Sequence, residues 1–208
     1  VLTASGGPFR GLTRAELARV TPEQALNHPT WDMGPVVTIN SATLMNKGLE
    51  LIEAHLLFDV APDHIITTVH PQSIVHSMVT WQDGATTLQA SPPDMGLAWP
   101  RRLRGVEEPL RWDAASQWTF EPVDDEAFPA VGLARAAVSA SATHPAVMNA
   151  ANEVLVSAFR AGAVGLPGIT DAVERVLGEH EGVEDPSLED VEAIERWARE
   201  RARELSAL

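Results

Sequence analysis

The C-terminal part of this chain carries the spacing of successive amphipathic helices, and this limits the possible folds more than any other feature. Apolar residues recur there at intervals of three and four, as they do along one face of a helix. The segments with this pattern are residues 128–140, 145–161, 168–179 and 187–205. Ser187 opens the last segment and Asp190 follows three positions later, which is the pattern of a helix cap. We therefore expect an α-helical bundle over residues 127–208.

The first half of the chain predicts a different architecture. Alternating and β-branched residues indicate strands at residues 63–70, 73–81 and 85–90. Asp83 and Gly84 form a hairpin turn between the last two strands. Thr13 and Thr21 each begin a short helix, because a Glu or Gln follows each of them three positions later. The expected fold class is α/β (α+β), with a small mixed sheet and helices over residues 1–105, a linker at 106–126, and the helical bundle after it.

The stretch from Ser41 to Glu50 brings a hydroxyl, an amide, an ammonium and a carboxylate together. The apolar spacing predicts one helix over residues 43–58 with Ser41 near its N-terminus, where a helix attracts anions. At about 100° per residue, Asn46 and Glu50 share one face, and Lys47 lies about 60° to one side of Glu50. This combination suits a phosphorylated substrate that also binds a metal. The alternative is an ordinary pair of Lys47 and Glu50 on a solvated helix surface.

Two loops upstream add candidate groups. The glycine-rich turn at residues 4–10 contains Ser5 and backbone N–H groups that would suit a phosphate, although most such runs are simple turns. A later loop rich in Pro and Gly carries His28, Trp31 and Met33. Large apolar side chains on a loop predict a lid that covers a ligand. The alternative is a loop that packs permanently on the core.

Polar residues also gather at the entrance of a predicted strand, where Ser73 and His76 follow His70. A single histidine in a strand is most often a core residue with satisfied hydrogen bonds. Two histidines and a serine would instead suit the wall of a pocket.

In their order and spacing, these motifs resemble the 1-deoxy-D-xylulose 5-phosphate reductoisomerase family. The segments that carry the resemblance are residues 4–10, 28–34, 41–50, 70–79, 90–95 and 149–153. The resemblance implies an NADPH-dependent oxidoreductase and isomerase of the non-mevalonate isoprenoid pathway. Such an enzyme rearranges the carbon skeleton of its phosphorylated sugar substrate and reduces the product to 2-C-methyl-D-erythritol 4-phosphate. We also expect a homodimer.

The resemblance implies a role for each matching residue. It assigns substrate binding to Ser5, His28, Trp31, Met33, Ser41, Asn46, Lys47, Ser73 and His76. It makes Glu50 a ligand of Mg²⁺ or Mn²⁺ and counts Glu50, Lys47 and His28 as catalytic residues. These roles agree with the chemistry, because a hard divalent cation takes oxygen ligands and a compact ammonium suits a phosphate.

The chain also departs from the family. It contains no G-x-G-x-x-G turn for NADPH, and it lacks the Asp-Ser-Glu triplet that the family places before the glycine-rich turn. Because Glu50 alone is a poor Mg²⁺ site, we expect this chain by itself to be inactive, and we assign it no cofactor-binding residue. The segment between Met95 and Pro100 is shorter than in the family. The alternative function is a non-catalytic assembly or dimerisation module derived from the family.

Composition excludes several other classes of protein. The net charge of -14 argues against nucleic-acid and anionic-membrane partners, which call for basic patches. No run of about 18 apolar residues is present, so we expect no membrane span. The sequence has no cysteine, which excludes disulfides and thiol catalysis and fits a cytoplasmic protein. The acidic run at 179–190 predicts a solvated loop.

Overall fold

The computed structural model describes residues 1–28, 33–90, 100–101 and 108–207 of the chain. These residues pack into two compact units. The sheet unit comprises Val1–Ser5 and Ile66–Val123, and the helical unit comprises Gly6–Ile65 and Asp124–Leu208. Both units therefore combine segments that lie far apart in the sequence.

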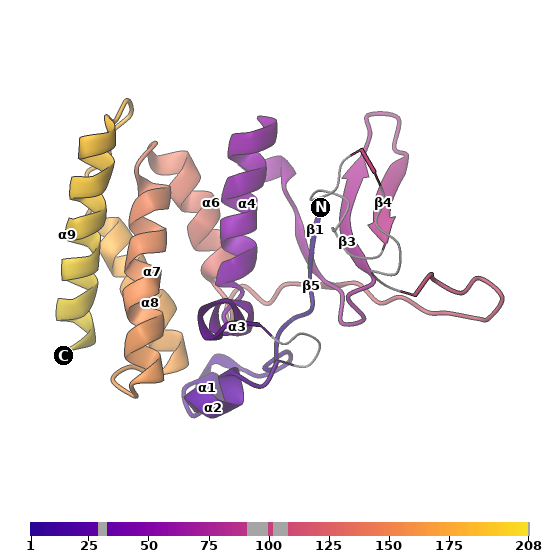
Figure 1. The fold of residues 1–208 in the computed structure, drawn as a ribbon, viewed down its shortest axis with the longest axis horizontal. Helices are drawn as coiled ribbons and strands as arrows, with labels where there is room; N and C mark the ends of the chain where they lie inside the picture. Colours follow the sequence, from indigo (N-terminus) through magenta and orange to yellow (C-terminus); the bar gives the residue numbers. More distant parts are fainter. Residues whose placement is uncertain (29–32, 91–99, 102–107, 208) are drawn as a thin grey trace. The chain divides into compact units, whose positions relative to one another are not determined.

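The sheet unit contains a five-stranded sheet with the order β4-β3-β1-β2-β5 (Figure 1). Its strands are β1 (Leu2–Ala4), β2 (Thr67–Val69), β3 (Val75–Thr80), β4 (Thr86–Ala90) and β5 (Glu121–Pro122). β1 and β2 run parallel, whereas the other neighbouring pairs are antiparallel. The small mixed sheet that the sequence predicts is confirmed.

The hairpin between β3 and β4 forms where the sequence predicts it. The Trp81 N–H donates to the Ala85 carbonyl oxygen at 2.8 Å, and the Ala85 N–H donates to Asp83 Oδ1 at 2.9 Å. Gly84 has a φ of +86°, a left-handed conformation that glycine adopts without steric penalty. Local turn chemistry therefore fixes the register of these two strands.

The strand predicted at 63–70 is wrong over its first half. Pro62–His64 forms a short 3-10 helix, η1, and only β2 pairs within the sheet. The Arg135 guanidinium donates hydrogen bonds to the carbonyl oxygens of Pro62 and Ile65, the second at 2.9 Å. These carbonyls are satisfied by a side chain instead of a neighbouring strand. The strands β1 and β5 were not predicted, because two or three residues are too short to show alternation.

The helical unit is built from packed helices (Figure 1). Its core is apolar. Its helices are α1 (Arg14–Leu17), α2 (Pro22–Ala25), α3 (Pro35–Ala42), α4 (Met45–Phe58), α6 (Ala130–Ala140), α7 (His144–Arg160), α8 (Leu166–Gly178) and α9 (Leu188–Ser206). Thr13, Thr21 and Ser187 each form a complete capping box, as predicted. The four predicted C-terminal helices are confirmed, with ends that shift by one or two residues. Fully buried core side chains include Ile39, Met45, Leu51, Met148, Leu155, Phe159 and Ile169.

The single helix predicted over 43–58 is wrong at its start. Two helices meet there, because α3 ends at Ala42 and Leu44 adopts a left-handed φ of 59° before α4 begins. Thr43 Oγ1 donates to the Ile39 carbonyl and accepts from the Met45 N–H at 3.3 Å, which satisfies backbone groups at the break. Ser41 therefore lies at the C-terminal end of α3 and not at a helix N-terminus. No helix was predicted over Pro35–Ala42, so α3 and the break after it appear only in the structure.

His144 at the start of α7 and His180 in the loop after α8 form a partly buried cluster. Their ring centroids lie 4.8 Å apart, and the His180 ring lies 5.6 Å from that of Trp197 on α9. Ser141 Oγ lies 2.7 Å from His144 Nδ1, and Thr143 Oγ1 lies 2.8 Å from His180 Nε2. Burial lowers the pKa of both histidines, and the positive charge that His144 would carry lowers the pKa of His180 further. The fold therefore favours two neutral imidazoles.

The stability of this fold should fall in mild acid because of that cluster. In the unfolded chain both imidazoles take up protons near the ordinary histidine pKa of about 6.5, before they do so in the fold. The contribution of His144 and His180 is therefore complete above that pH and is lost as the pH falls through it. Urea unfolding at pH 7.5 and 5.5 measures this. The double variant His144→Gln/His180→Gln should lose less stability over that interval than the wild type, and an equal loss would contradict the assignment.

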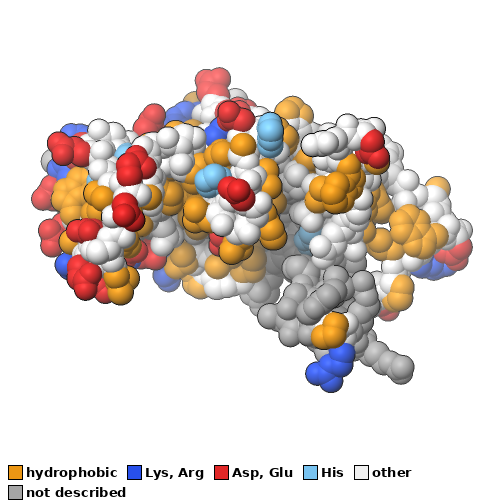
Figure 2. Space-filling model, turned by 90° about the horizontal axis from the view of Figure 1, so that it is seen from above, with side chains coloured by type: hydrophobic (Ala, Val, Ile, Leu, Met, Phe, Trp, Pro, Cys, Tyr) orange, Lys and Arg blue, Asp and Glu red, His pale blue; other side chains and the backbone are white. Residues whose placement is uncertain are grey.

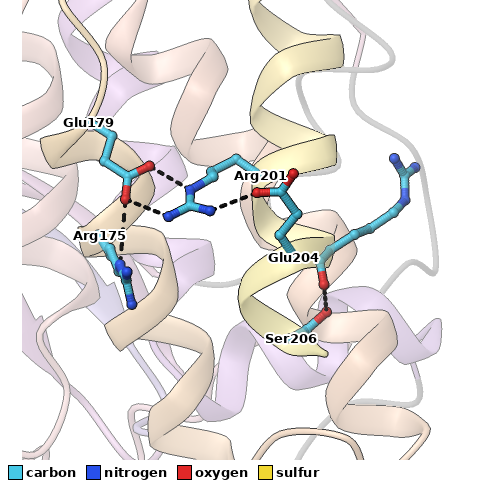
Figure 3. Close-up of polar contacts among 6 residues, drawn as sticks. Arg175, Glu179, Arg201, Glu204 and Ser206 are labelled. Carbon is cyan, nitrogen blue, oxygen red and sulfur yellow. Dashed lines mark hydrogen bonds and ion pairs between the residues drawn. The ribbon is translucent and has the colours of Figure 1, made fainter. Parts of the chain in front are cut away.

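A charged network joins the end of α8 to α9 (Figure 3). The Arg201 guanidinium donates to both carboxylate oxygens of Glu179, at 2.6 and 2.9 Å, and to Glu204 at 2.6 Å. These hydrogen bonds lower the pKa of Glu179. Acidic side chains, shown in red, also gather around α9 at the left of Figure 2. The acidic run at 179–190 forms a largely exposed loop up to residue 187, whereas its last three residues begin α9.

Candidate functional site

The predicted polar cluster forms at the start of α4. Lys47 Nζ donates to both carboxylate oxygens of Glu50 at 2.7 Å, and Asn46 Nδ2 donates to Glu50 Oε1 at 2.8 Å. The Lys47 side chain is 18% exposed and that of Glu50 is 33% exposed. Both side chains of this pair are therefore only partly buried. Lys47 is also the only lysine in the sequence.

The backbone behind this cluster is held tightly. A Cβ placed on Gly48 would lie 2.9 Å from the Ala130 carbonyl oxygen and 3.0 Å from the Ala134 Cβ. Only a glycine lets α4 approach α6 this closely. Lys47 and Glu50 therefore project from a helix turn that is fixed from the opposite side.

Ser41 and His28 meet beside the end of α3. His28 Nε2 lies 3.1 Å from Ser41 Oγ. Partial burial lowers the pKa of His28, so the neutral imidazole is favoured. A neutral imidazole can donate one hydrogen bond and accept another, which suits contact with both a serine and a phosphate oxygen.

The glycine-rich turn lies against the same end of α3. Gly6 and Gly7 have φ values of 88° and 63°. A Cβ on Gly7 would lie 2.9 Å from the Ser41 carbonyl oxygen and 3.1 Å from the Ala42 Cα. The turn, the hydroxyl of Ser41 and the imidazole of His28 are thus brought together. The sequence places them more than ten residues apart, and only the fold shows that they meet.

The sheet unit holds three further predicted residues. Ser5 follows β1 and is half-buried, and Ser73 and His76 are also half-buried. Ser73 has a left-handed φ of 50°, a strained conformation for a residue with a side chain. His70 is fully buried, with Nδ1 2.8 Å from the Thr119 carbonyl oxygen and its ring stacked on Phe120 at 4.5 Å. His70 is therefore part of the core, and its Nε2 has no hydrogen-bond partner among the described residues.

Parts of the predicted lid and of the shortened segment lie outside the described residues. Trp31 is one such position, and so is the run from Met95 to Trp99. Met33 is described and half-buried, and its carbonyl oxygen accepts from Thr38 Oγ1 at 3.3 Å.

A buried amide pair was missed by the sequence analysis. Asn152 Nδ2 on α7 donates to Asn40 Oδ1 on α3 at 3.0 Å. The motif at 149–153 points to Asn152 as a polar residue on a helix face, but its partner Asn40 is 112 positions away and has no local pattern. Asn149 and Glu153, the other polar residues of this motif, bond to each other at 3.2 Å nearer the surface.

The polar groups described above are better suited to binding a phosphate than to forming a complete metal site. Hydroxyl, amide, ammonium and imidazole groups can bind phosphate oxygens. Among the described residues, no group of three or more His, Asp or Glu side chains could hold a metal ion. Glu50 can supply one carboxylate, so a divalent cation here would need ligands from elsewhere. None of the described helices is long and apolar enough to cross a membrane.

Two family models match the chain. The first is described as "DXP reductoisomerase C-terminal domain" and matches residues 90–201. The second is described as "1-deoxy-D-xylulose 5-phosphate reductoisomerase C-terminal domain" and matches residues 1–58. The first match alone covers more than half of the chain.

Known proteins agree with these matches. Relatives named 1-deoxy-D-xylulose 5-phosphate reductoisomerase include one from Beutenbergia cavernae, 63% identical over 100% of this chain and 55% of the relative. Another, from Leifsonia xyli subsp. xyli, is 59% identical over 97% of this chain and 58% of the relative. The alignment with the Beutenbergia relative runs over 215 residues, so the relative has residues inside the aligned region that this chain does not.

Solved structures have the same fold. The reductoisomerase from Zymomonas mobilis in complex with NADPH gives a TM-score of 0.88 at 43% identity, over 100% of this chain and 54% of that chain. A DOX-P reductoisomerase in complex with NADPH, fosmidomycin and magnesium gives a TM-score of 0.90 at 34% identity, over 99% and 54%. This chain spans about half the length of the relatives it matches. With two family models and close relatives in agreement, the chain belongs to the 1-deoxy-D-xylulose 5-phosphate reductoisomerase family.

Proposed function

We propose that the full-length protein is an NADPH-dependent 1-deoxy-D-xylulose 5-phosphate reductoisomerase and that this chain supplies its substrate-binding groups and part of its metal site. The proposed product is 2-C-methyl-D-erythritol 4-phosphate. The observation that carries the proposal is the Asn46, Lys47 and Glu50 cluster, which the structure holds together on one turn of α4. The structures with bound NADPH and magnesium support the choice of cofactors.

In this proposal Glu50 is a ligand of Mg²⁺ or Mn²⁺. The ion would polarise the substrate carbonyl and stabilise negative charge on its oxygens. Lys47 and Asn46, which now bond to the Glu50 carboxylate, would turn their donors to the substrate when Glu50 binds the metal. Both groups lie within hydrogen-bond distance of the same carboxylate oxygen, so they are close enough to bind one ligand together.

His28 and Ser41 would bind the substrate phosphate with the backbone of the glycine-rich turn. Their contact of 3.1 Å and the close approach of Gly7 to Ser41 support a shared site. The neutral His28 imidazole would donate a hydrogen bond to a phosphate oxygen. Ser5, Ser73 and His76 are proposed as further substrate contacts. Trp31 and Met33 are proposed to cover the substrate carbon chain.

We further propose that the protein is a cytoplasmic homodimer without a nucleic-acid or membrane partner. We also propose a catalytic domain at residues 1–105, a linker at 106–126 and a C-terminal helical domain at 127–208. Support for the homodimer comes from large apolar side chains on the β3–β4 hairpin, where Val79, Trp81 and Leu88 are all exposed. No residue of this chain is proposed to bind NADPH, since the sequence contains no G-x-G-x-x-G turn.

The proposal is tested by following NADPH oxidation by the full-length protein. Absorbance should fall only when 1-deoxy-D-xylulose 5-phosphate and Mg²⁺ or Mn²⁺ are both present. The alternative is a non-catalytic assembly module, which the single carboxylate of the described site favours. That module would leave NADPH unchanged with either metal.

Lys47→Ala should raise the KM for the substrate about 10- to 100-fold. A hydrogen bond to a charged group contributes about 1.5–3 kcal/mol, and 1.4 kcal/mol corresponds to about tenfold in affinity. Steady-state kinetics on the full-length protein measure this, with Lys47→Arg as the control that keeps the charge and should lose less. An unchanged KM in Lys47→Ala would remove Lys47 from the substrate site.

A further inference from the structure

The buried pair of Asn40 and Asn152 joins two helices inside the helical unit. Asn152 is 1% exposed and lies on α7, and Asn40 is 6% exposed and lies on α3, which packs against α7. Their side chains meet through a hydrogen bond of 3.0 Å. The pair therefore ties the C-terminal half of the chain directly to the segment that carries Ser41.

Apolar packing alone does not account for this pair. Ala151 and Leu155 beside Asn152 are fully buried, as is Met148 one turn earlier. A buried amide costs free energy unless its hydrogen bonds are made, and two apolar residues of similar size could fill this space. Asn152 Oδ1 has no hydrogen-bond partner among the described residues. Such a pair is better explained by the position that it gives to α3 relative to α7. A hydrogen bond fixes the relative position of two helices more narrowly than apolar contact does.

The part of α3 that this pair fixes is the part that meets the candidate site. Asn40 directly precedes Ser41, whose hydroxyl lies 3.1 Å from His28 Nε2. The Ser41 carbonyl also borders the close approach of Gly7. A shift of this helix end would move the hydroxyl, the imidazole and the glycine-rich turn relative to one another.

We propose that Asn152 is a positioning residue for the phosphate-binding end of α3, acting through Asn40 on Ser41 and His28. The inference rests on the proposed function for its ligand, a phosphorylated sugar, but the contact chain itself does not depend on that function. Asn152 bonds to Asn40, which directly precedes Ser41 on α3, so its effect on Ser41 and His28 is passed through that helix.

The chain offers a matched control on the same helix. Asn149 lies three residues before Asn152 and bonds to Glu153 at 3.2 Å instead of reaching α3. Replacing Asn149 removes the same side chain from α7 without touching Asn40. A general loss of helix stability would therefore affect both positions, whereas a positioning role belongs to Asn152 alone.

The experiment compares Asn152→Ala, Asn40→Ala, their double variant and Asn149→Ala in the full-length protein. The first readout is the NMR signal of the His28 imidazole, assigned with a His28→Gln variant, and it needs no catalysis. The second is the split between KM and kcat. Asn152→Ala should move the His28 signal and raise the KM at least about tenfold with little change in kcat, because displaced hydrogen bonds to the charged phosphate weaken substrate binding by about that factor. Asn149→Ala should change neither.

The double variant should match the single variants in KM, because either replacement breaks the same contact. A His28 signal in Asn152→Ala that equals the wild-type signal would overturn the inference. A moved signal in a protein that turns over no substrate would instead overturn the proposed function and leave the positioning role intact. If Asn152→Ala does not fold, Asn40→Ala applies the same test from α3.

Discussion

Glu50→Gln should lower the metal-dependent turnover of the full-length protein at least about a thousandfold, because a neutral amide replaces the carboxylate that binds the metal and metal stabilisation of charge is worth several kcal/mol. Folding should change little. Glutamine has nearly the same shape, and the ion pair with Lys47 is partly exposed, so its loss should cost no more than about 1 kcal/mol. Kinetics over a range of Mg²⁺ concentrations and urea unfolding measure both effects.

Glu195 provides a matched control for this replacement. Its side chain is 32% exposed, close to the 33% of Glu50, and it also pairs with a cation, Arg199 at 2.8 Å. Glu195→Gln removes an equivalent helix ion pair on α9 and should leave turnover unchanged. Activity retained in Glu50→Gln would place the metal site elsewhere.

Gly7→Ala should reduce both stability and substrate affinity. Its φ of 63° costs a residue with a side chain about 1–2 kcal/mol, and forcing a methyl group to within 2.9 Å of the Ser41 carbonyl should cost about 1–3 kcal/mol more. Any relief of that clash moves the glycine-rich turn away from Ser41. Urea unfolding should therefore show a large loss, and the KM for the substrate should rise.

Gly11 separates the two causes. It has a φ of 83°, but a Cβ placed there would meet nothing within 4 Å. Gly11→Ala should therefore show only the backbone cost and an unchanged KM. If both variants lose the same free energy of unfolding, the close approach of the glycine-rich turn to α3 does not contribute to stability.

Local patterns predicted much of the fold. The capping boxes at Thr13, Thr21 and Ser187 form as the sequence indicates, because each depends on residues three positions apart. The strand prediction failed at Pro62–His64, where Arg135 from a distant helix binds the backbone. Helix α3 was missed for another reason, since its buried residues include the polar Thr38 and Asn40, which interrupt an apolar pattern.

The candidate site divides in the same way. The contacts of Glu50 with Asn46 and Lys47 follow from helical spacing and could be predicted. The contact of His28 with Ser41 crosses 13 positions, and that of Asn40 with Asn152 crosses 112. No local sequence pattern predicts the partners of these residues, so the contacts could be identified only in the folded structure.

The measurement that tests the proposed function most directly is the identity of the product. The full-length protein would be incubated with ¹³C-labelled 1-deoxy-D-xylulose 5-phosphate, NADPH and Mg²⁺, and the label followed by NMR. We predict that the label appears in the branched skeleton of 2-C-methyl-D-erythritol 4-phosphate. With the Glu50→Gln variant, no labelled product should form. Unchanged labelled substrate, from a folded wild-type protein with either Mg²⁺ or Mn²⁺, would contradict it.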